Sequence, residues 1–213
     1  MKITVYGAAG TVGRRIASEA VARGHKVTGV VRTKAQFGNV PDNVSPCAAD
    51  VSDMAQLIRT IKGQDLVISA LRPPQGHEDV LVALTRSVLD GAAAGGVRVL
   101  VVGGAGRLLL PESDGETVLN APGFLPASVV PIARACQAQY ELCLNETRVN
   151  WTYLSPAAML EPGNRTGRYR LGTDTLMIDE NGASRISIED FAVAMLDEVE
   201  RPKHERRAFA VGY

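Results

Sequence analysis

The first 32 residues constrain the fold more than any other stretch of this 213-residue chain. An apolar run at positions 2–6 leads into a turn with glycines at positions 7, 10 and 13, and a helical pattern follows. A strand that enters a helix through such a turn places the unpaired N–H groups of the helix N-terminus beside the turn. The pattern predicts a βα unit whose helix N-terminus binds an anion such as a pyrophosphate.

The three glycines have separate expected roles. Gly7 takes the tight turn after the strand, Gly10 lets the backbone approach a phosphate, and Gly13 allows close packing of helix on strand. Gly24 is placed to end the helix, and a second apolar strand follows over residues 25–31. This context favours a dinucleotide site over the alternative, a glycine turn without a ligand.

Strands and helices continue to alternate along most of the chain. Strands are expected at 44–50, 65–71, 97–102, 150–154 and 206–211, and helices at 53–62, 78–94, 131–147 and 187–200. Short βα connections require right-handed crossovers, which predicts an α/β fold of the Rossmann type: a doubly wound parallel sheet with helices on both faces. We expect a single domain over residues 1–213, with a dinucleotide-binding core at 1–155. Residues 156–213 should form a small substrate-side lobe with the last helix and strand.

Several predictions concern the ends of these elements and the stretches between them. Ser52 is expected to cap the helix at 53–62, and Ser187 to cap the last helix. Residues 107–131 are too long for a passive connection and are interpreted as a loop or lid beside the site. Residues 161–185 are predicted to form loop with one or two short hairpins.

Composition and charge disfavour several classes of partner. The chain has 23 basic and 23 acidic side chains and a formal net charge of zero, so nothing favours nucleic acid or an anionic membrane. No apolar run approaches the length of a membrane span, and the sequence opens directly in a core strand, which predicts a cytoplasmic protein. Three cysteines without a CxxC pair fit buried, chemically inert thiols, and three scattered histidines offer no metal site.

The ligand of a doubly wound sheet lies at the carboxyl ends of its strands. Arg32 stands where an NAD-specific site usually offers a carboxylate, and with Thr33 it suits a 2′-phosphate. NADP(H) is therefore preferred over NAD(H), the alternative being a solvated arginine that merely ends a strand. Asp50 is placed either to meet the adenine edge or to cap the helix that follows.

Several motifs together resemble the atypical short-chain dehydrogenase/reductases, and within them the NADH-flavin reductase branch, near the NmrA-like and biliverdin-IXβ reductase groups. They are the glycine turn, Val30 to Arg32, Asp50, Ile68 to Ala70, and residues 101–106, 151–158 and 161–170. The resemblance covers nearly the whole chain. It implies that Pro156 to Ala158 face the nicotinamide, and that its ribose meets the loops at 70–71 and 103–104.

The predicted cofactor site gathers the residues from both arguments. They are Gly7, Ala9, Gly10, Thr11, Val12, Gly13, Arg32, Thr33, Asp50, Val51, Ala70, Leu71, Arg72, Gly103, Gly104, Pro156, Ala157 and Ala158. No residue stands out as a catalytic group, and the candidates are His77, Tyr140 and Tyr153. A lone histidine before a helix is more often a surface residue. Arg165, Arg168 and Arg170 suit a flavin phosphate, and a solvated hairpin face explains them equally well.

One departure from the superfamily pattern limits the chemistry. Reductases of alcohols and ketones use a Tyr-x-x-x-Lys pair, but no tyrosine here has lysine four residues later. Hydride transfer to a flavin or quinone-like ring needs no such pair, because the ring itself accepts the hydride. We expect an NADPH-dependent reductase with flavin as substrate rather than as bound cofactor. The alternative is a non-catalytic NADP-binding redox sensor that reports to a protein partner.

Overall fold

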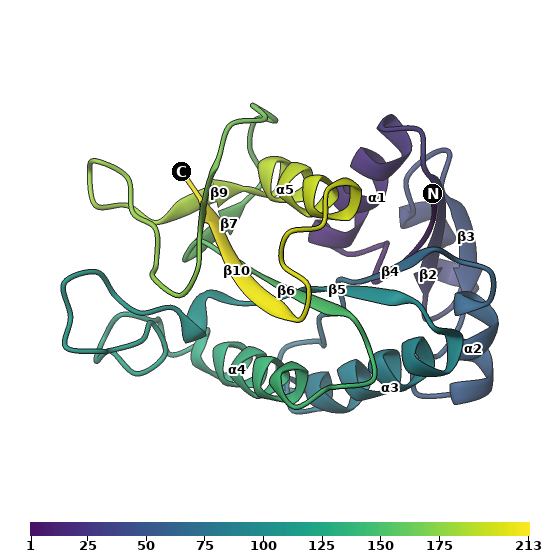
Figure 1. The fold of residues 1–213 in the computed structure, drawn as a ribbon, viewed down its shortest axis with the longest axis horizontal. Helices are drawn as coiled ribbons and strands as arrows, with labels where there is room; N and C mark the ends of the chain where they lie inside the picture. The colour runs from purple at the N-terminus through teal and green to yellow at the C-terminus, as the bar shows by residue number, and fades with distance from the viewer.

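The computed structural model describes residues 1–213, which form one eight-stranded sheet covered by helices and a separate two-stranded sheet (Figure 1). In chain order the elements are β1 (Lys2–Tyr6), α1 (Thr11–Ala22), β2 (Lys26–Val31), the 3₁₀ helix η1 (Lys34–Asn39), β3 (Ser45–Ala48), α2 (Met54–Ile61), β4 (Leu66–Ser69), α3 (Val80–Gly95), β5 (Arg98–Val102), the 3₁₀ helix η2 (Ala105–Arg107), α4 (Val130–Leu144), β6 (Trp151–Pro156), β7 (Met159–Glu161), β8 (Arg170–Gly172), β9 (Arg185–Ser187), α5 (Ile188–Glu200) and β10 (Arg207–Gly212).

The strand order of the large sheet is β3-β2-β1-β4-β5-β6-β10-β8. All neighbouring strands pair in parallel except β10 and β8, which are antiparallel. The chain moves outward from β1 to β3 and then crosses back to β4, so the switch point lies between β1 and β4. The predicted Rossmann-type architecture is confirmed.

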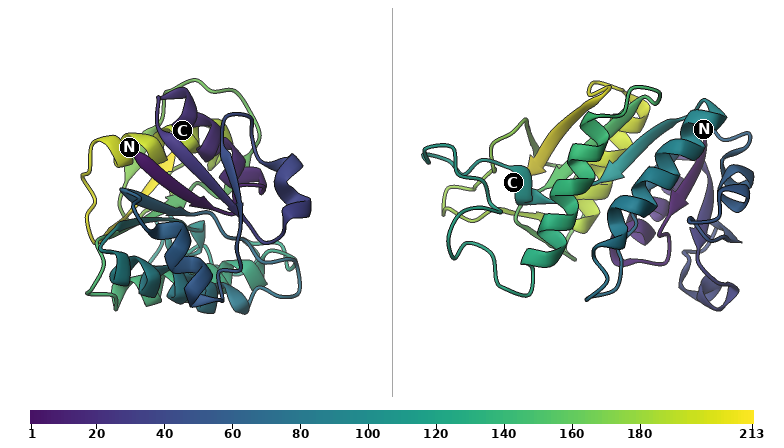
Figure 2. Two further views of the ribbon diagram at one scale, coloured as in Figure 1. Left: turned by 90° about the vertical axis from the view of Figure 1, so that its right-hand side faces the viewer. Right: turned by 90° about the horizontal axis from the view of Figure 1, so that it is seen from below.

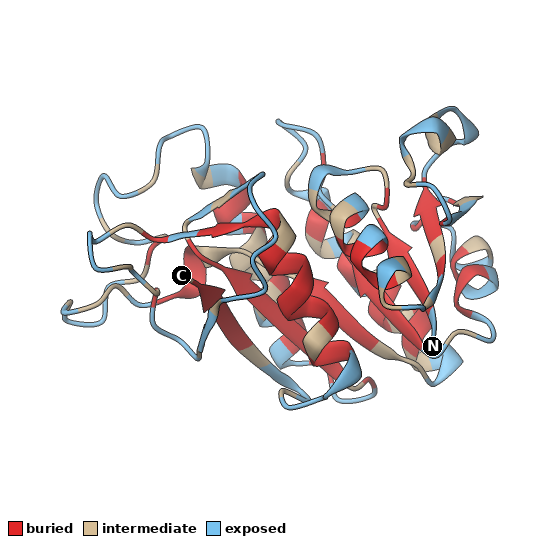
Figure 3. Ribbon diagram, turned by 90° about the horizontal axis from the view of Figure 1, so that it is seen from above, coloured by how far each residue is buried: buried red, intermediate tan, exposed pale blue.

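Two helix layers enclose the sheet. α1 and α5 cover one face, and α2, α3 and α4 lie side by side on the other, as Figures 1 and 2 show. On the first face Ile16 of α1 and Phe191 and Met195 of α5 are fully buried in one apolar cluster with strand residues. Burial of each such side chain contributes about 1.5–3 kcal/mol. The central strands are buried along their length, whereas the long loops around the carboxyl-terminal lobe are exposed (Figure 3).

Ionic contacts also join α1 to α5. The Arg23 guanidinium, just past the end of α1, donates to Asp197 Oδ1 at 2.7 Å and to Glu200 Oε2 at 3.0 Å. At the other end of the pair, Arg15 Nε donates to Glu189 Oε1 at 3.1 Å. The first and last helices therefore act as one layer.

Helix caps were predicted with mixed success. Ser187 caps α5, since its Oγ accepts the Asp190 N–H at 3.0 Å. The prediction for Ser52 is wrong, because Asp53 is the capping residue of α2 and its Oδ1 accepts the N–H groups of Ala55 and Gln56. Ser52 instead donates to Asp50, two residues earlier. An aspartate next to the serine offers the stronger, charged acceptor.

The predicted hairpins between 161 and 185 are also wrong. β8 pairs with β10, and β7 pairs in parallel with β9, so neither strand pairs with the next one in sequence. Residues 34–39 form η1, which the sequence pattern did not indicate. The predicted loop at 107–131 is irregular for most of its length. Its Leu108 and Val118 pack on Leu176 in the carboxyl-terminal lobe.

Two other features bear on the class of protein. The three cysteines are free, and burial raises the pKa of the Cys143 thiol to about 12, which suits a packing role.

None of the helices has both the length and the apolar character that a membrane crossing requires.

Candidate functional site

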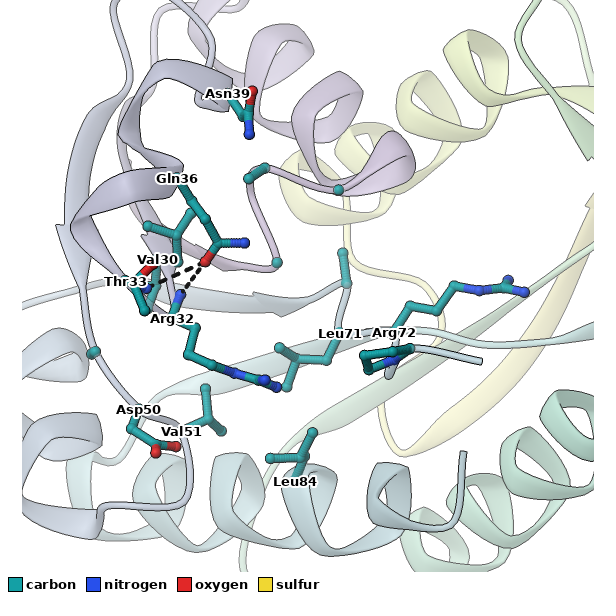
Figure 4. Close-up of a pocket in the computed structure, with 17 residues that line it drawn as sticks. Val30, Arg32, Thr33, Gln36, Asn39, Asp50, Val51, Leu71, Arg72 and Leu84 are labelled. Carbon is teal, nitrogen blue, oxygen red and sulfur yellow. Dashed lines mark hydrogen bonds between the residues drawn. The ribbon is translucent and has the colours of Figure 1, made fainter. Parts of the chain in front are cut away.

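A cavity of about 470 Å³ opens at the carboxyl ends of β1, β2 and β4, where the strand order reverses (Figure 4). Ligands of doubly wound folds bind at this position. The lining residues are Gly7, Ala9, Gly10, Val30, Val31, Arg32, Thr33, Gln36, Asn39, Ala49, Asp50, Val51, Ala70, Leu71, Arg72, Pro74 and Leu84. Most of the predicted cofactor residues from the first half of the chain are among them, whereas Thr11, Val12, Gly13 and the predicted residues after 100 are not.

The glycine turn is fixed by close backbone packing. Gly7 has φ +78°, and a Cβ there would lie 2.4 Å from the Ala70 carbonyl oxygen. A Cβ on Gly13 would lie 2.2 Å from the Gly7 carbonyl oxygen, so any side chain would push α1 off the turn. Gly10 differs, since its Cβ would meet only the Gly7 oxygen, at 3.2 Å, and its outer side is open.

The start of α1 suits an anion. The helix is capped by Gly10, which has no side chain to accept the first N–H groups, and its first turn carries no acidic residue. Unpaired N–H groups and the positive end of the helix dipole therefore lie beside the cavity without a competing carboxylate.

Arg32 extends from the end of β2 into the cavity (Figure 4). Its side chain is exposed, and its guanidinium makes no hydrogen bond or salt bridge within the protein. The loop around it is held by Gln36, whose Oε1 accepts the backbone N–H groups of Arg32 at 3.1 Å and of Thr33 at 3.3 Å. The guanidinium is thus available to a ligand, while the backbone that carries it is fixed.

Asp50 lies beside Arg32, just after the end of the neighbouring strand β3 (Figure 4). Its Oδ1 accepts the Ser52 hydroxyl at 2.7 Å and the Ser52 N–H at 2.9 Å, and these bonds lower the pKa of the carboxyl group. Asp50 does not cap α2. Its second carboxylate oxygen has no partner, so an adenine contact stays a prediction.

Arg72 follows β4 and is a second cation on the cavity wall. Its exposed guanidinium has no hydrogen bond or salt bridge within the protein and extends away from Arg32 along the sheet edge (Figure 4). The cavity wall thus carries two arginines and one carboxylate, that of Asp50, so its charge favours an anionic ligand.

The loops expected at the nicotinamide end lie outside this cavity. Gly103 ends β5 against the Tyr153 ring, where a Cβ would come within 2.1 Å of a ring carbon. The Gly104 N–H donates to Tyr153 Oη at 3.2 Å, and Ala157 is almost completely buried. Contacts of Gly103, Gly104 and Pro156 to Ala158 with a nicotinamide therefore stay predictions.

None of the three catalytic candidates lines the cavity. Tyr153 is only 1% exposed, donates to the Cys136 carbonyl oxygen at 2.9 Å, and has a pKa raised well above 10 by burial. His77 is exposed on the loop before α3 and its ring makes no hydrogen bond. Tyr140 is half-buried, with its ring 5.2 Å from that of Tyr153 and 4.9 Å from the Arg107 guanidinium carbon. The positions of Tyr140 and Tyr153 suit packing better than proton transfer.

Arg107 is a residue that sequence reasoning missed. It follows β5 and its side chain is only 4% exposed. The guanidinium donates to Ser155 Oγ at 2.9 Å, to Asp174 Oδ1 at 2.6 Å and to the Thr173 carbonyl oxygen at 2.8 Å. It therefore joins β6 to the 173–174 segment. An arginine between a glycine-rich strand end and three leucines was the available signal.

The basic group at 165–170 is largely occupied by protein partners. Arg165 donates to both carboxylate oxygens of Glu19, each at 2.8 Å, and this pair is the main cause of the lowered pKa of Glu19. Arg170 donates to the carbonyl oxygens of Ile178 and Tyr213. Both side chains hold the carboxyl-terminal lobe in place, which argues against a flavin phosphate at either of them.

Asp190 anchors the same lobe. It is fully buried, and its carboxylate accepts the Thr166 N–H at 2.8 Å, the Thr166 hydroxyl at 2.6 Å, the Gly167 N–H at 2.7 Å and the Tyr213 hydroxyl at 2.7 Å. Burial alone raises the pKa of this carboxyl group, but the hydrogen bonds from Thr166 and Tyr213 keep it below 3.8. The charge is thus stabilised entirely inside the protein.

A glycine turn at the switch point of a doubly wound sheet, with cations on the cavity wall, defines a nucleotide-binding Rossmann protein. The sequence profile of the NAD(P)H-binding family matches residues 7–199, and the chain belongs to that family. Among its members the chain falls with the atypical short-chain dehydrogenase/reductases, as its motifs predict.

Several known proteins are similar to this chain over almost its whole length. The protein YwnB of Bacillus subtilis (strain 168), itself uncharacterised, is 36% identical over 99% of this chain and 98% of its own length. A protein of Streptococcus pneumoniae TIGR4, provisionally described as an NADH-flavin reductase, is 31% identical, with a TM-score of 0.89 over 100% of this chain and 99% of that one. A provisionally named epimerase of Bacteroides thetaiotaomicron is 37% identical, with a TM-score of 0.90 over 100% of this chain and 96% of that one. A protein of Burkholderia pseudomallei, provisionally described as exported, is 39% identical, with a TM-score of 0.90 over 100% of both chains.

Proposed function

We propose that this protein is an NADPH-dependent reductase that passes hydride to a flavin or to a quinone-like conjugated ring. The observation that carries the proposal is the unpaired guanidinium of Arg32, which extends into the cavity opposite the glycine turn. A 2′-phosphate supplies the bidentate, doubly charged partner that this group lacks within the protein. The name of the Streptococcus relative supports the choice of a flavin as acceptor.

The residues present fit a dinucleotide. The packing at Gly7 and Gly13 leaves no room for side chains, and the open side of Gly10 lets a pyrophosphate approach the N–H groups of α1. Apolar Val51, Leu71 and Leu84 lie around the end of the Arg32 side chain and offer a slot for an adenine ring (Figure 4). NADPH, when bound, supplies the hydride.

The protein's own part in the reaction is to align the reactants rather than to supply a proton. On α4, Ala133 and Gln137 stand where we expect the tyrosine and lysine of related ketone reductases, and Gln137 donates to Glu141 at 2.9 Å. Neither side chain transfers a proton. A conjugated acceptor takes the hydride into its own ring and a proton from water, so correct placement suffices.

A second candidate function is an NADP-binding redox sensor that acts through a protein partner. It is favoured by the absence of any proton-transferring candidate from the cavity wall: Tyr153 is buried, and His77 and Tyr140 lie elsewhere. Such a protein needs only the affinity of the cavity for its nucleotide.

Steady-state oxidation of NADPH in the presence of FMN, FAD and a set of quinones separates the two functions. We expect acceptor-dependent oxidation that saturates with both substrates. Tight binding of NADPH without oxidation above the rate of the free cofactor would support the sensor and reject the reductase.

A further inference from the structure

The orientation of the Gln36 side chain is set by its hydrogen bonds. Both groups that it contacts in the loop, the backbone N–H groups of Arg32 and Thr33, are donors. A carboxamide can satisfy two donors only with its oxygen, so Oε1 must face the loop and the NH₂ group must face the other way. Figure 4 shows the amide nitrogen pointing away from the loop backbone and into the cavity, on the side of the glycine turn.

This orientation matters because the two cofactors differ at one ribose position. The 2′-phosphate of NADP(H) is an acceptor-only group, whereas the 2′-hydroxyl of NAD(H) is best served by a carboxylate. At this end of the cavity the protein offers two kinds of donor, the Arg32 guanidinium and the Gln36 NH₂ group. The only carboxylate among the lining residues is that of Asp50, which follows the neighbouring strand β3 and whose Oδ1 accepts the Ser52 hydroxyl and N–H.

We propose that Gln36 is a specificity-determining residue, which selects NADP(H) over NAD(H) by holding an amide donor toward the 2′-phosphate. The inference rests on the proposed function, since it assigns a role within the same cavity. Gln36 acts together with Arg32: the guanidinium supplies charge on a flexible stem, and the carboxamide supplies a donor whose direction is fixed by the loop.

The experiment exchanges the amide for a carboxylate of the same shape. In Gln36→Glu, one carboxylate oxygen still accepts the N–H groups of Arg32 and Thr33, so the loop keeps its conformation. The other oxygen replaces the NH₂ group and repels a phosphate. We expect the dissociation constant of NADP⁺, measured by calorimetry, to rise roughly 30-fold. The constant for NAD⁺ should fall or stay unchanged.

Two further variants control for charge and for folding. Gln64→Glu makes the same charge change just before β4, at the amino-terminal ends of the strands and away from the cavity, and should leave both constants unchanged. Gln36→Ala removes the NH₂ donor, together with the Oε1 acceptor of the loop N–H groups, without adding charge. It should weaken NADP⁺ binding several-fold while NAD⁺ binding is unaffected. The ratio of the dissociation constants of 2′,5′-ADP and 5′-AMP provides a second readout, because these two nucleotides differ only in the 2′-phosphate.

The ratio of the two dissociation constants decides the outcome. A shift of threefold or more toward NAD⁺ in Gln36→Glu, absent from Gln64→Glu, supports the assignment, and a smaller shift overturns it. If Gln36→Glu does not fold, the same criterion applies to Gln36→Ala. Failure of the wild-type protein to bind either nucleotide would reject the proposed function and the role of Gln36 with it, and is recognised from the wild-type titration alone.

Discussion

Arginines serve opposite purposes in the cavity and in the carboxyl-terminal lobe. In the cavity, the guanidinium groups of Arg32 and Arg72 have no partner within the protein. Arg107, which contacts the lobe from η2, and Arg165 within it are each bound to a carboxylate, and Asp190 has hydrogen bonds from three residues. The same type of side chain is therefore left unpaired in one region and joins segments of the protein in the other.

The difference teaches that the partners of a charge, rather than its presence, identify a binding site. A charge that is removed from water requires compensation, which the lobe supplies internally. The cavity leaves its cations exposed to solvent, so an anionic ligand can satisfy them. Four measurements test this contrast.

The largest effect is expected from Asp190→Ala in the lobe. The substitution leaves the donors of Thr166, Gly167 and Tyr213 without their buried acceptor, and we expect a loss of about 3–5 kcal/mol in the free energy of unfolding. Urea denaturation measures it. Asp42→Ala, at an exposed position without a side-chain partner, is the control. A loss below 1 kcal/mol would contradict the internal role of this charge.

A smaller loss is expected from Gly13→Ala. The new methyl group would lie 2.2 Å from the Gly7 carbonyl oxygen, so α1 must shift, at a cost of about 1–3 kcal/mol. Affinity for NADPH should fall as well, because the turn moves with the helix. Gly38→Ala, where a Cβ meets nothing within 4 Å, provides the matched comparison. Equal thermal stabilities of the two variants would show that the close packing of Gly13 against the Gly7 carbonyl oxygen is not needed for stability.

In the cavity, Arg32→Ala should act on binding alone. We expect NADP⁺ binding to weaken by about 1–3 kcal/mol while NAD⁺ binding and the unfolding midpoint hardly change, because the guanidinium has no partner within the protein. Calorimetric titration with both nucleotides measures this. Equal losses for the two would refute the contact with the 2′-phosphate.

The smallest effect is expected from Arg165→Gln. The Arg165 side chain is exposed although its partner Glu19 is buried, so we expect the free energy of unfolding to fall by less than about 1 kcal/mol at neutral pH. The rate of FMN reduction should not change. Because the pKa of Glu19 lies below 4.5 in the folded protein, the pair stabilises the fold above that pH and ceases to do so as the pH falls through the lower, folded value. Acid unfolding curves should therefore converge for wild type and variant. Arg168→Gln, exposed and unpaired, is the control, and a loss of FMN reduction specific to Arg165→Gln would restore a substrate role.

Local signals made the first half of the fold and several of the residues that line the cavity predictable. Gly7, Gly10 and Gly13 act within a few residues of one another, and Arg32 follows its strand directly, so their roles depend on short-range geometry. The cavity indeed contains Gly7, Gly10 and Arg32. Gln36 was not predicted, because its importance depends on the turn that η1 makes after the strand.

The carboxyl-terminal lobe was not predictable in the same way. β8 pairs with β10 about forty residues later, and Arg165 meets Glu19, 146 positions away. No pattern within the 161–185 stretch specifies such partners, and a hairpin was the local alternative. The capping residue of α2 was predicted wrongly although the signal is local. Ser52 and Asp53 are both good capping residues and are adjacent, and only the course of the backbone decides which of them caps the helix.

The joining of α1 to α5 has a consequence for how the protein folds. Arg23 and Asp197 are 174 positions apart, so the helix layer that contains α1 forms only when the first and last parts of the chain meet. Contacts of such long sequence separation slow folding, because the chain loses much entropy before they form. A fragment that ends before residue 188 would contain every glycine of the turn, yet it would leave the apolar face of α1 in water. The glycine turn is local in the sequence, but its stability depends on nearly the whole polypeptide.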